Sequence, residues 1–182
     1  MKTIIFVLGS VVLIYISRGS LRTVRSHGFP RLLAWECILG LFLLNADFWF
    51  VEPFAWNQLL AWALLILSLV PLGYGVHFLR TRGQPTQQRV SDPALLGFEK
   101  TTQLVTSGIY KYIRHPLYCF LLLLAWGIFF KRPDVTTFTL SVVSNIFLFF
   151  TAKMDEAECL GFFGDEYQEY MQYSKMFIPY IF

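Results

Sequence analysis

Residues 108–118 bring basic, aromatic and polar side chains together directly before a long apolar run. The segment ends in Arg114-His115-Pro116, and proline suits the first turn of a helix because its missing N–H would have no partner there. A helix that starts at Pro116 would point unpaired N–H groups toward an anion, beside an arginine and a histidine. On its own the motif is more typical of a basic residue that sets membrane topology, followed by a helix-starting proline.

A second polar segment, Asp155-Glu156-Ala157-Glu158, follows the last long apolar run. Its carboxylates could bind an ammonium group or ribose hydroxyls. Taken alone, the pair is typical of the solvated end of a helix. The two segments can form one site only if the elements between them place both on the same side of the molecule.

The composition indicates the kind of element that must position these segments. The chain has 182 residues, of which 55% are hydrophobic and 15% are charged, whereas a soluble domain has about a quarter charged residues. We therefore predict an all-α, polytopic integral membrane protein with a single membrane domain. The bilayer core is ~30 Å thick and needs about 20 helical residues. Five transmembrane helices are predicted, over residues 3–17, 31–51, 57–79, 116–130 and 133–152.

Basic residues predict the orientation of these helices. Two loops carry most of them, and positive residues mark the cytoplasmic side. They are Arg18, Arg22, Arg25 and Arg31 after the first helix, and Arg80, Arg82, Arg89, Lys100, Lys111 and Arg114 before the fourth. The N-terminus is then outside and the C-terminus cytoplasmic, in the cell membrane if the source is prokaryotic. Residues 80–115 and the tail from residue 153 share the cytoplasmic face, which is the main reason to expect a site there.

The tail is expected to continue the fifth helix into water, with Gly161 and Gly164 interrupting it. Residues 165–171 predict a new helix with acidic residues in its first turn, as the helix dipole favours. Tyr167, Tyr170, Met171 and Ser174 share one face of this helix by their spacing. An aromatic face of this kind is expected to lie at the membrane interface.

Other common sites are not indicated. Three cysteines and three histidines are scattered along the chain, so neither a disulfide framework nor a metal site is predicted. There is no strand pattern followed by GxGxxG, so a soluble dinucleotide-type fold is not indicated. Nucleic acid is not expected as a partner.

Several short motifs in order resemble one family over residues 100–179. They are Leu104 to Gly108, Tyr110, Arg114-His115-Pro116 with Tyr118, Asp155-Glu156, Phe163-Gly164-Asp165-Glu166-Tyr167, Tyr170 and Ile178-Pro179. Together they resemble the isoprenylcysteine carboxyl methyltransferase family and the wider group of integral membrane methyltransferases that includes phospholipid N-methyltransferases. The first three helices, residues 1–79, match only in being apolar, and residues 80–182 would hold the methyltransferase core.

The resemblance implies methyl transfer from S-adenosylmethionine to a lipophilic acceptor or lipidated substrate in the membrane. A carboxylate of the isoprenylcysteine type is the expected acceptor, and a phospholipid amine is the alternative. A non-enzymatic or sterol-reductase-like membrane protein is the second alternative. The cofactor would contact Thr102, Gln103, Leu104, Val105, Tyr110, His115, Pro116, Leu117, Tyr118, Asp155 and Glu156. The catalytic residues would be Arg114, His115 and Glu156.

Specific roles are expected for some of these residues. Backbone N–H groups of residues 102–105 and of the helix start at His115-Pro116 would bind the cofactor carboxylate. Asp155 or Glu156 would bind its ammonium or ribose, and Tyr110 and Tyr118 its adenine or sulfonium. Arg114 would position the acceptor or hold the acidic pair. A carboxylate acceptor needs no general base, whereas an amine does.

Two residues depart from the family pattern. The first acid is Asp155 where the family commonly has glutamate. Thr151 stands where the eukaryotic prenylcysteine enzymes have an arginine for the substrate carboxylate, which leaves the acceptor less well defined than the donor.

Overall fold

The computed structural model describes residues 1–21, 26–84, 95 and 99–181. The basic residues Arg22, Arg25 and Arg89 of the predicted cytoplasmic loops lie outside these ranges. The described residues form α-helices and short 3-10 turns without a named strand, so the all-α prediction is confirmed for them. The α-helices are α1 (Lys2–Ile16), α2 (Arg18–Leu21), α3 (Gly28–Asn45), α4 (Trp56–Arg82), α5 (Pro116–Phe129), α6 (Val135–Phe163) and α7 (Asp165–Tyr173), and two of the 3-10 turns are η1 (Ala46–Phe48) and η3 (Gly108–Lys111).

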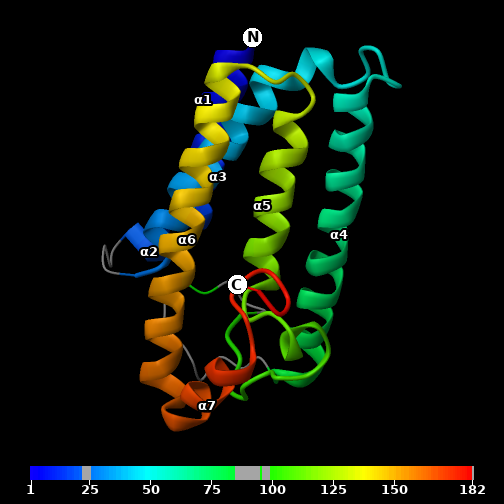
Figure 1. Cartoon of the computed structure of the whole chain (residues 1–182). Helices are drawn as coiled ribbons and strands as arrows, with labels where there is room; N and C mark the ends of the chain where they lie inside the picture. Colours follow the sequence, from blue (N-terminus) through cyan, green and yellow to red (C-terminus); the bar gives the residue numbers. More distant parts are fainter. Residues whose placement is uncertain (22–25, 85–94, 96–98, 182) are drawn as a thin grey trace.

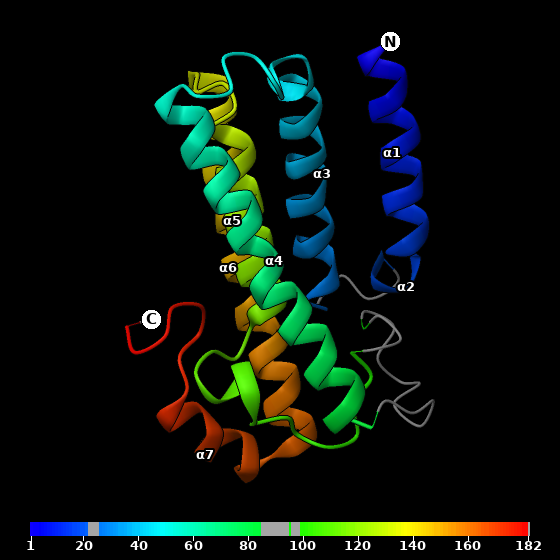
Figure 2. The same ribbon diagram turned by 90° about the vertical axis from the view of Figure 1, so that its right-hand side faces the viewer.

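The long helices run up and down in one bundle (Figure 1). α4 packs along α5, and α3 packs along α6. α1 lies at the edge of the bundle against α3 (Figure 2). The N-terminus and α7 lie at opposite ends of the bundle, so the tail gathers at the end where α4 stops and α5 starts (Figure 1).

Apolar helices occur at all five predicted positions, but their lengths differ. Three candidate membrane spans, Gly28–Phe48, Trp56–Arg82 and Val135–Phe163, are long and apolar enough to cross a bilayer. Lys2–Ile16 and Pro116–Phe129 are shorter apolar helices. Many apolar side chains of α1 and α4 are exposed, including Val7, Val11, Ile66 and Leu69. Exposed apolar surface of this extent is typical of a protein surrounded by lipid.

The hairpin between α5 and α6 is set by local capping. Asp134 accepts a hydrogen bond from the Thr137 backbone N–H at 2.9 Å, and the Thr137 hydroxyl accepts one from the Asp134 N–H at 3.1 Å. This reciprocal capping box satisfies two N–H groups that a helix start otherwise leaves unpaired. α5 begins with Pro116 in its first turn, as the sequence predicted.

The fifth predicted helix is longer than expected. α6 continues beyond residue 152 and through Gly161 to Phe163, so the prediction that Gly161 interrupts it is wrong. A single glycine costs a helix only about 1 kcal/mol. Gly164 ends α6 in a left-handed conformation with φ 59°, and α7 follows directly, as predicted. Asp155 and Glu156 therefore sit within a continuous helix rather than at a frayed end.

Candidate functional site

The segment before α5 is held by the chain that follows α7. Lys175 N–H donates to the Tyr112 carbonyl at 3.0 Å, and Arg114 N–H donates to the Lys175 carbonyl at 2.7 Å. His115 N–H donates to the Met176 carbonyl at 3.2 Å. These bonds form a short parallel bridge around Ile113 and Lys175. The end of the chain thus holds the backbone that leads to Arg114 and His115.

His115 lies between the two acids of α6. Its Nδ1 is 3.5 Å from Asp155 Oδ2, and its Nε2 is 3.5 Å from Glu156 Oε1. The ring stacks on Tyr118 with centroids 5.3 Å apart, and the Tyr118 hydroxyl donates to Asp155 Oδ2 at 3.2 Å. The structure therefore joins the basic segment before α5 to the acidic pair of α6.

The charge state of His115 follows from this position. Burial lowers the pKa of His115, but hydrogen bonds and charges from Asp155 and Glu156 outweigh that effect, so its pKa is raised above the usual value. An imidazolium between two carboxylates is a favourable arrangement because each acid stabilises the positive charge. The two acids therefore favour the protonated form of His115.

Arg114 holds Glu156. Its Nε donates to Glu156 Oε1 at 2.8 Å, and its Nη2 lies 2.7 Å from the same oxygen. Lys153 Nζ donates to Glu156 Oε2 at 3.1 Å, and Arg114 Nη1 donates to the Ser174 carbonyl. Glu156 is 3% exposed. Arg114 and Lys153 therefore already bind the Glu156 carboxylate, which fits the expectation that Arg114 would hold an acid of α6.

A pocket opens beside His115, with a volume of about 670 Å³ when the space open to solvent is included. Nine of the sequence-predicted site residues line it: Leu104, Val105, Tyr110, Arg114, His115, Pro116, Leu117, Tyr118 and Asp155. Thr102, Gln103 and Glu156 are not among its lining residues. Thr102 and Gln103 instead donate their backbone N–H groups to the Gly83 carbonyl, at 3.1 and 3.3 Å. They brace the loop against the end of α4.

The tail contributes more to the pocket than the sequence indicated. Tyr167 and Tyr170 line it and are 3% and 2% exposed, and burial raises the pKa of both phenols. The Tyr170 hydroxyl donates to the Tyr110 carbonyl at 2.6 Å. The predicted shared face of these tyrosines is confirmed, and both are buried at the pocket. The face closes the pocket because its apolar rings find more burial there.

Glu99 also lines the pocket, although no pattern in the sequence indicated it. Its Oε2 accepts a hydrogen bond from Arg31 Nη1 at 3.0 Å. Arg31 is 2% exposed. A charged residue within an apolar helix was the signal that could have singled out Arg31, because such residues in membrane proteins are functional candidates.

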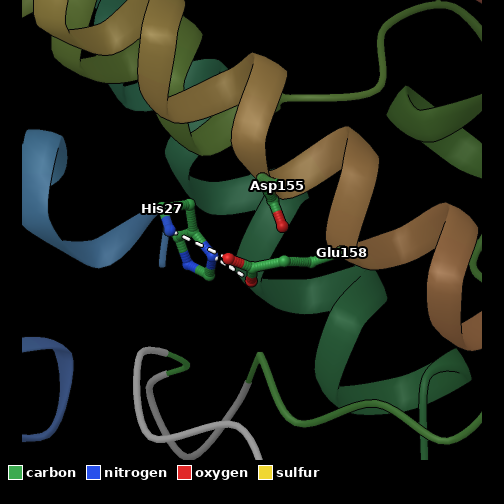
Figure 3. A group of neighbouring side chains, drawn as sticks. All are labelled: His27, Asp155 and Glu158. Carbon is green, nitrogen blue, oxygen red and sulfur yellow. Dashed lines mark hydrogen bonds and ion pairs between the residues drawn. The ribbon is translucent and has the colours of Figure 1, made fainter. Parts of the chain in front are cut away.

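A second histidine meets α6 on the α3 side. His27, Asp155 and Glu158 place one potential ligand atom each within 4.8 Å of one another (Figure 3). Glu158 Oε1 accepts from the His27 backbone N–H at 2.9 Å, and Oε2 lies 2.5 Å from His27 Nδ1. Burial lowers the pKa of His27, but Asp155 and Glu158 outweigh it, so the pKa is raised. The Glu158 carboxylate thus caps the start of α3.

Residues 92–168 match the model of the phospholipid methyltransferase family. Methanethiol S-methyltransferase 1 of Bradyrhizobium diazoefficiens is 33% identical over 47% of this chain and 30% of its own length. Methanethiol S-methyltransferase of a Pseudomonas species is 27% identical over 68% of this chain and 49% of its own. Protein-S-isoprenylcysteine O-methyltransferase of Schizosaccharomyces pombe is 37% identical over 43% of this chain and 34% of its own.

The aligned part of the chain thus spans at most about half the length of these curated relatives. No solved structure gives a significant match. The resemblance inferred from the motifs is confirmed, because the matched region contains both Arg114-His115-Pro116 and Asp155-Glu156.

Proposed function

From the match of residues 92–168 to the phospholipid methyltransferase family model, we propose that this chain transfers a methyl group from S-adenosylmethionine to a lipophilic acceptor. The observation that carries the proposal is the pocket that His115, Asp155 and several tyrosines line together. When bound, the donor supplies an activated methyl group, so that displacement by an acceptor oxygen breaks the sulfur–carbon bond and leaves the electron pair on sulfur.

The lining of the pocket fits such a donor. Asp155 offers a carboxylate to an ammonium group or ribose, and His115 with Arg114 offers positive charge to a carboxylate. Tyr110, Tyr118, Tyr167 and Tyr170 offer ring faces to an adenine or a sulfonium. The cationic, anionic and flat ring parts of one ligand would thus each find a complementary group in the pocket: a carboxylate, a positive charge and an aromatic ring.

The chain's own contribution to the reaction is alignment and exclusion of water. Holding the reacting groups in place can supply ~7–11 kcal/mol of barrier reduction. The backbone hydrogen bonds to residues 175–176 and the Arg114–Glu156 ion pair hold His115 and the start of α5 in place. His115, Tyr118 and Tyr170 are all at most 5% exposed, so this side of the pocket is shielded from water.

For the acceptor we propose a carboxylate on an apolar chain, of the isoprenylcysteine type. The name of the Schizosaccharomyces pombe relative supports it. A carboxylate is already a nucleophile and needs no base, which agrees with a His115 that favours its protonated form. A phospholipid amine would need a group to take its proton, and His115 is poorly suited to that. A thiol is the second candidate, supported by the two relatives named for methanethiol.

The site would face the cytoplasm, with the N-terminus on the other side of the membrane. The basic residues Arg80, Arg82 and Lys100 near the pocket end support this orientation. An acceptor carried in the bilayer would then reach the pocket from between the helices.

The proposal is tested with purified protein in detergent and donor labelled in its methyl group. Label should pass to a farnesylated cysteine and not to phosphatidylethanolamine, with dodecanethiol as a third acceptor. Absence of donor binding would overturn the methyltransferase proposal. Donor binding with transfer only to the amine or only to the thiol would overturn the carboxylate assignment.

A further inference from the structure

Arg31 lies where the donor pocket meets an apolar groove within the helix bundle. On the pocket side it bonds Glu99 and interacts electrostatically with Asp155 and Tyr118, all three of which line the pocket. On the other side its guanidinium carbon lies 5.1 Å from the centre of the Trp35 ring, and Trp35 lines the groove. This single cation therefore stands between the two spaces.

The groove has the size and character of a site for a hydrocarbon chain. Its empty volume is about 1970 Å³, including space open to the surroundings. α1 and α4 border it, and α3, seen between them in Figure 2, contributes to it with α5. Ser68 is the one polar side chain among the residues that line it. Tyr118 of the pocket and Leu121 of the groove are one turn apart on α5, so the two spaces are neighbours.

The register of α3 against α6 places Arg31 near Asp155. The His27–Glu158 hydrogen bond and the Ser144 hydroxyl bond to the Ala34 carbonyl at 3.4 Å align the two helices in opposite directions. Arg31 lies between His27 and Ala34, so it is level with the part of α6 between Ser144 and Glu158. Thr151 in that part donates its hydroxyl to the Phe147 carbonyl at 2.7 Å and carries no charge. Arg31 of α3 supplies a buried cation at this level.

A buried guanidinium is costly unless a carboxylate faces it. Glu99 supplies that carboxylate, with a side chain 12% exposed against 3% for Arg31. Glu99 belongs to the loop before α5 and to none of the helices. Glu99 therefore places a carboxylate beside the buried Arg31 cation at the pocket wall.

We propose that Arg31 anchors the carboxylate of an amphipathic acceptor whose apolar chain lies in this groove, and that Glu99 holds the place of that carboxylate until the acceptor binds. This inference rests on the proposed methyl transfer and specifies how the acceptor is selected. A neutral or cationic head group could not replace the Glu99 carboxylate on Arg31, so the Arg31–Glu99 ion pair would stay intact. The pair thus selects an anionic head on a hydrocarbon chain.

The test measures binding to protein in lipid nanodiscs saturated with S-adenosylhomocysteine, the demethylated donor. The probes are N-acetyl-S-farnesylcysteine and its carboxamide, which differ in charge alone. The native chain should bind the carboxylate at least tenfold more tightly. Arg31→Gln should abolish this preference while its affinity for S-adenosylhomocysteine stays within twofold, and Arg31→Lys should retain part of it. Arg82→Gln, at an exposed position near the end of α4, is the matched control and should change nothing.

Glu99→Gln separates this role from that of a structural ion pair. Removing the competing carboxylate should tighten carboxylate binding severalfold, whereas a purely structural pair predicts that Glu99→Gln and Arg31→Gln weaken it alike. Equal affinities of the native chain for the two probes would overturn the inference alone, since donor binding would persist. Loss of S-adenosylhomocysteine binding by the native chain would instead overturn the proposed function.

The groove is tested by narrowing it. Leu124→Trp places a larger ring among the groove residues and should weaken the farnesyl probe at least fivefold while sparing an S-methyl analogue. Leu67→Trp is the control, because Leu67 is 51% exposed on α4 and does not line the groove. An equal effect of both substitutions, or no effect of Leu124→Trp, would place the chain elsewhere and contradict the inference.

Discussion

Asp155 is the residue on which the contacts of the site converge. It meets His115, the Tyr118 hydroxyl and the Cys159 thiol, and it lines the donor pocket. Glu156, its neighbour in sequence, instead forms ion pairs with Arg114 and Lys153. The two acids that were predicted as a pair therefore have different tasks, one at the pocket and one in the frame that supports it.

Asp155→Asn tests the first task. Loss of a charge-assisted hydrogen bond costs about 1.5–3 kcal/mol, so donor affinity measured by calorimetry should fall roughly 10- to 100-fold. Asp165→Asn changes an exposed acid in the first turn of α7 and should leave affinity unchanged. Native affinity in Asp155→Asn would exclude this carboxylate from the donor site.

The raised pKa of His115 gives a signed pH dependence. The ring is more basic in the folded chain than its unfolded value of about 6.5. Its contribution to stability is therefore full below about pH 6.5 and is lost as the pH rises through the raised pKa. The thermal midpoint of the native chain should exceed that of His115→Gln by most at low pH, and the difference should shrink toward pH 9.

His27 has the same sign, because its pKa is also raised. Comparing the native chain with His115→Gln at each pH leaves the His27 contribution in both and isolates His115. A difference that grows with pH would mean that His115 is neutral in the folded chain.

At the scale of elements, the turn before α5 depends on one glycine. Gly108 starts η3 with φ 63°, and a Cβ there would lie 2.2 Å from the Phe78 ring of α4. Gly161 within α6 has no heavy atom within 4 Å of such a Cβ. Substituting both glycines therefore distinguishes the effect of backbone conformation and close packing at Gly108 from the general effect of replacing a glycine, which Gly161 reports.

Gly108→Ala should destabilise the chain by about 2–4 kcal/mol, from left-handed backbone strain and overpacking together. Gly161→Ala should be neutral or stabilising by up to about 1 kcal/mol, since alanine favours a helix. Unfolding midpoints in detergent measure both. Equal effects would mean that η3 rearranges freely and does not hold the start of α5.

At the scale of the whole molecule, an odd number of membrane crossings would put the N-terminus and the pocket on opposite sides. The arrangement in Figure 1 is consistent with this, because α1 starts at the end of the bundle away from α7. The two shorter helices, Lys2–Ile16 and Pro116–Phe129, decide whether the number is five. At 1.5 Å per residue, α5 is about 21 Å long and would cross only where the bilayer is thin or its neighbours shield its ends.

Reporter fusions test the orientation. A fluorescent protein fused after Phe182 should fold and fluoresce in the cytoplasm, whereas alkaline phosphatase should be active only when inserted in the loop at residues 51–55. Phosphatase activity at the C-terminus would reverse the predicted orientation and move the donor pocket outside.

Local patterns determined much of this protein. Apolar runs predicted where helices lie, Pro116 marked the start of α5, and the spacing of Tyr167 and Tyr170 predicted a helical face. The motif order in residues 100–179 predicted the resemblance to the methyltransferase family whose model matches residues 92–168. These features depend on neighbours within a few residues, so they can be predicted from the chain itself.

Tertiary packing alone decided the rest. It turned the tyrosine face into the pocket, directed Glu156 away from it, and brought Arg31 and His27 from the start of α3 to the level of Asp155. None of these placements follows from local periodicity, because each depends on how α3 and the tail align with α6. A buried charge is stable only where a partner from another element meets it, and that partner is known only once the helices are packed.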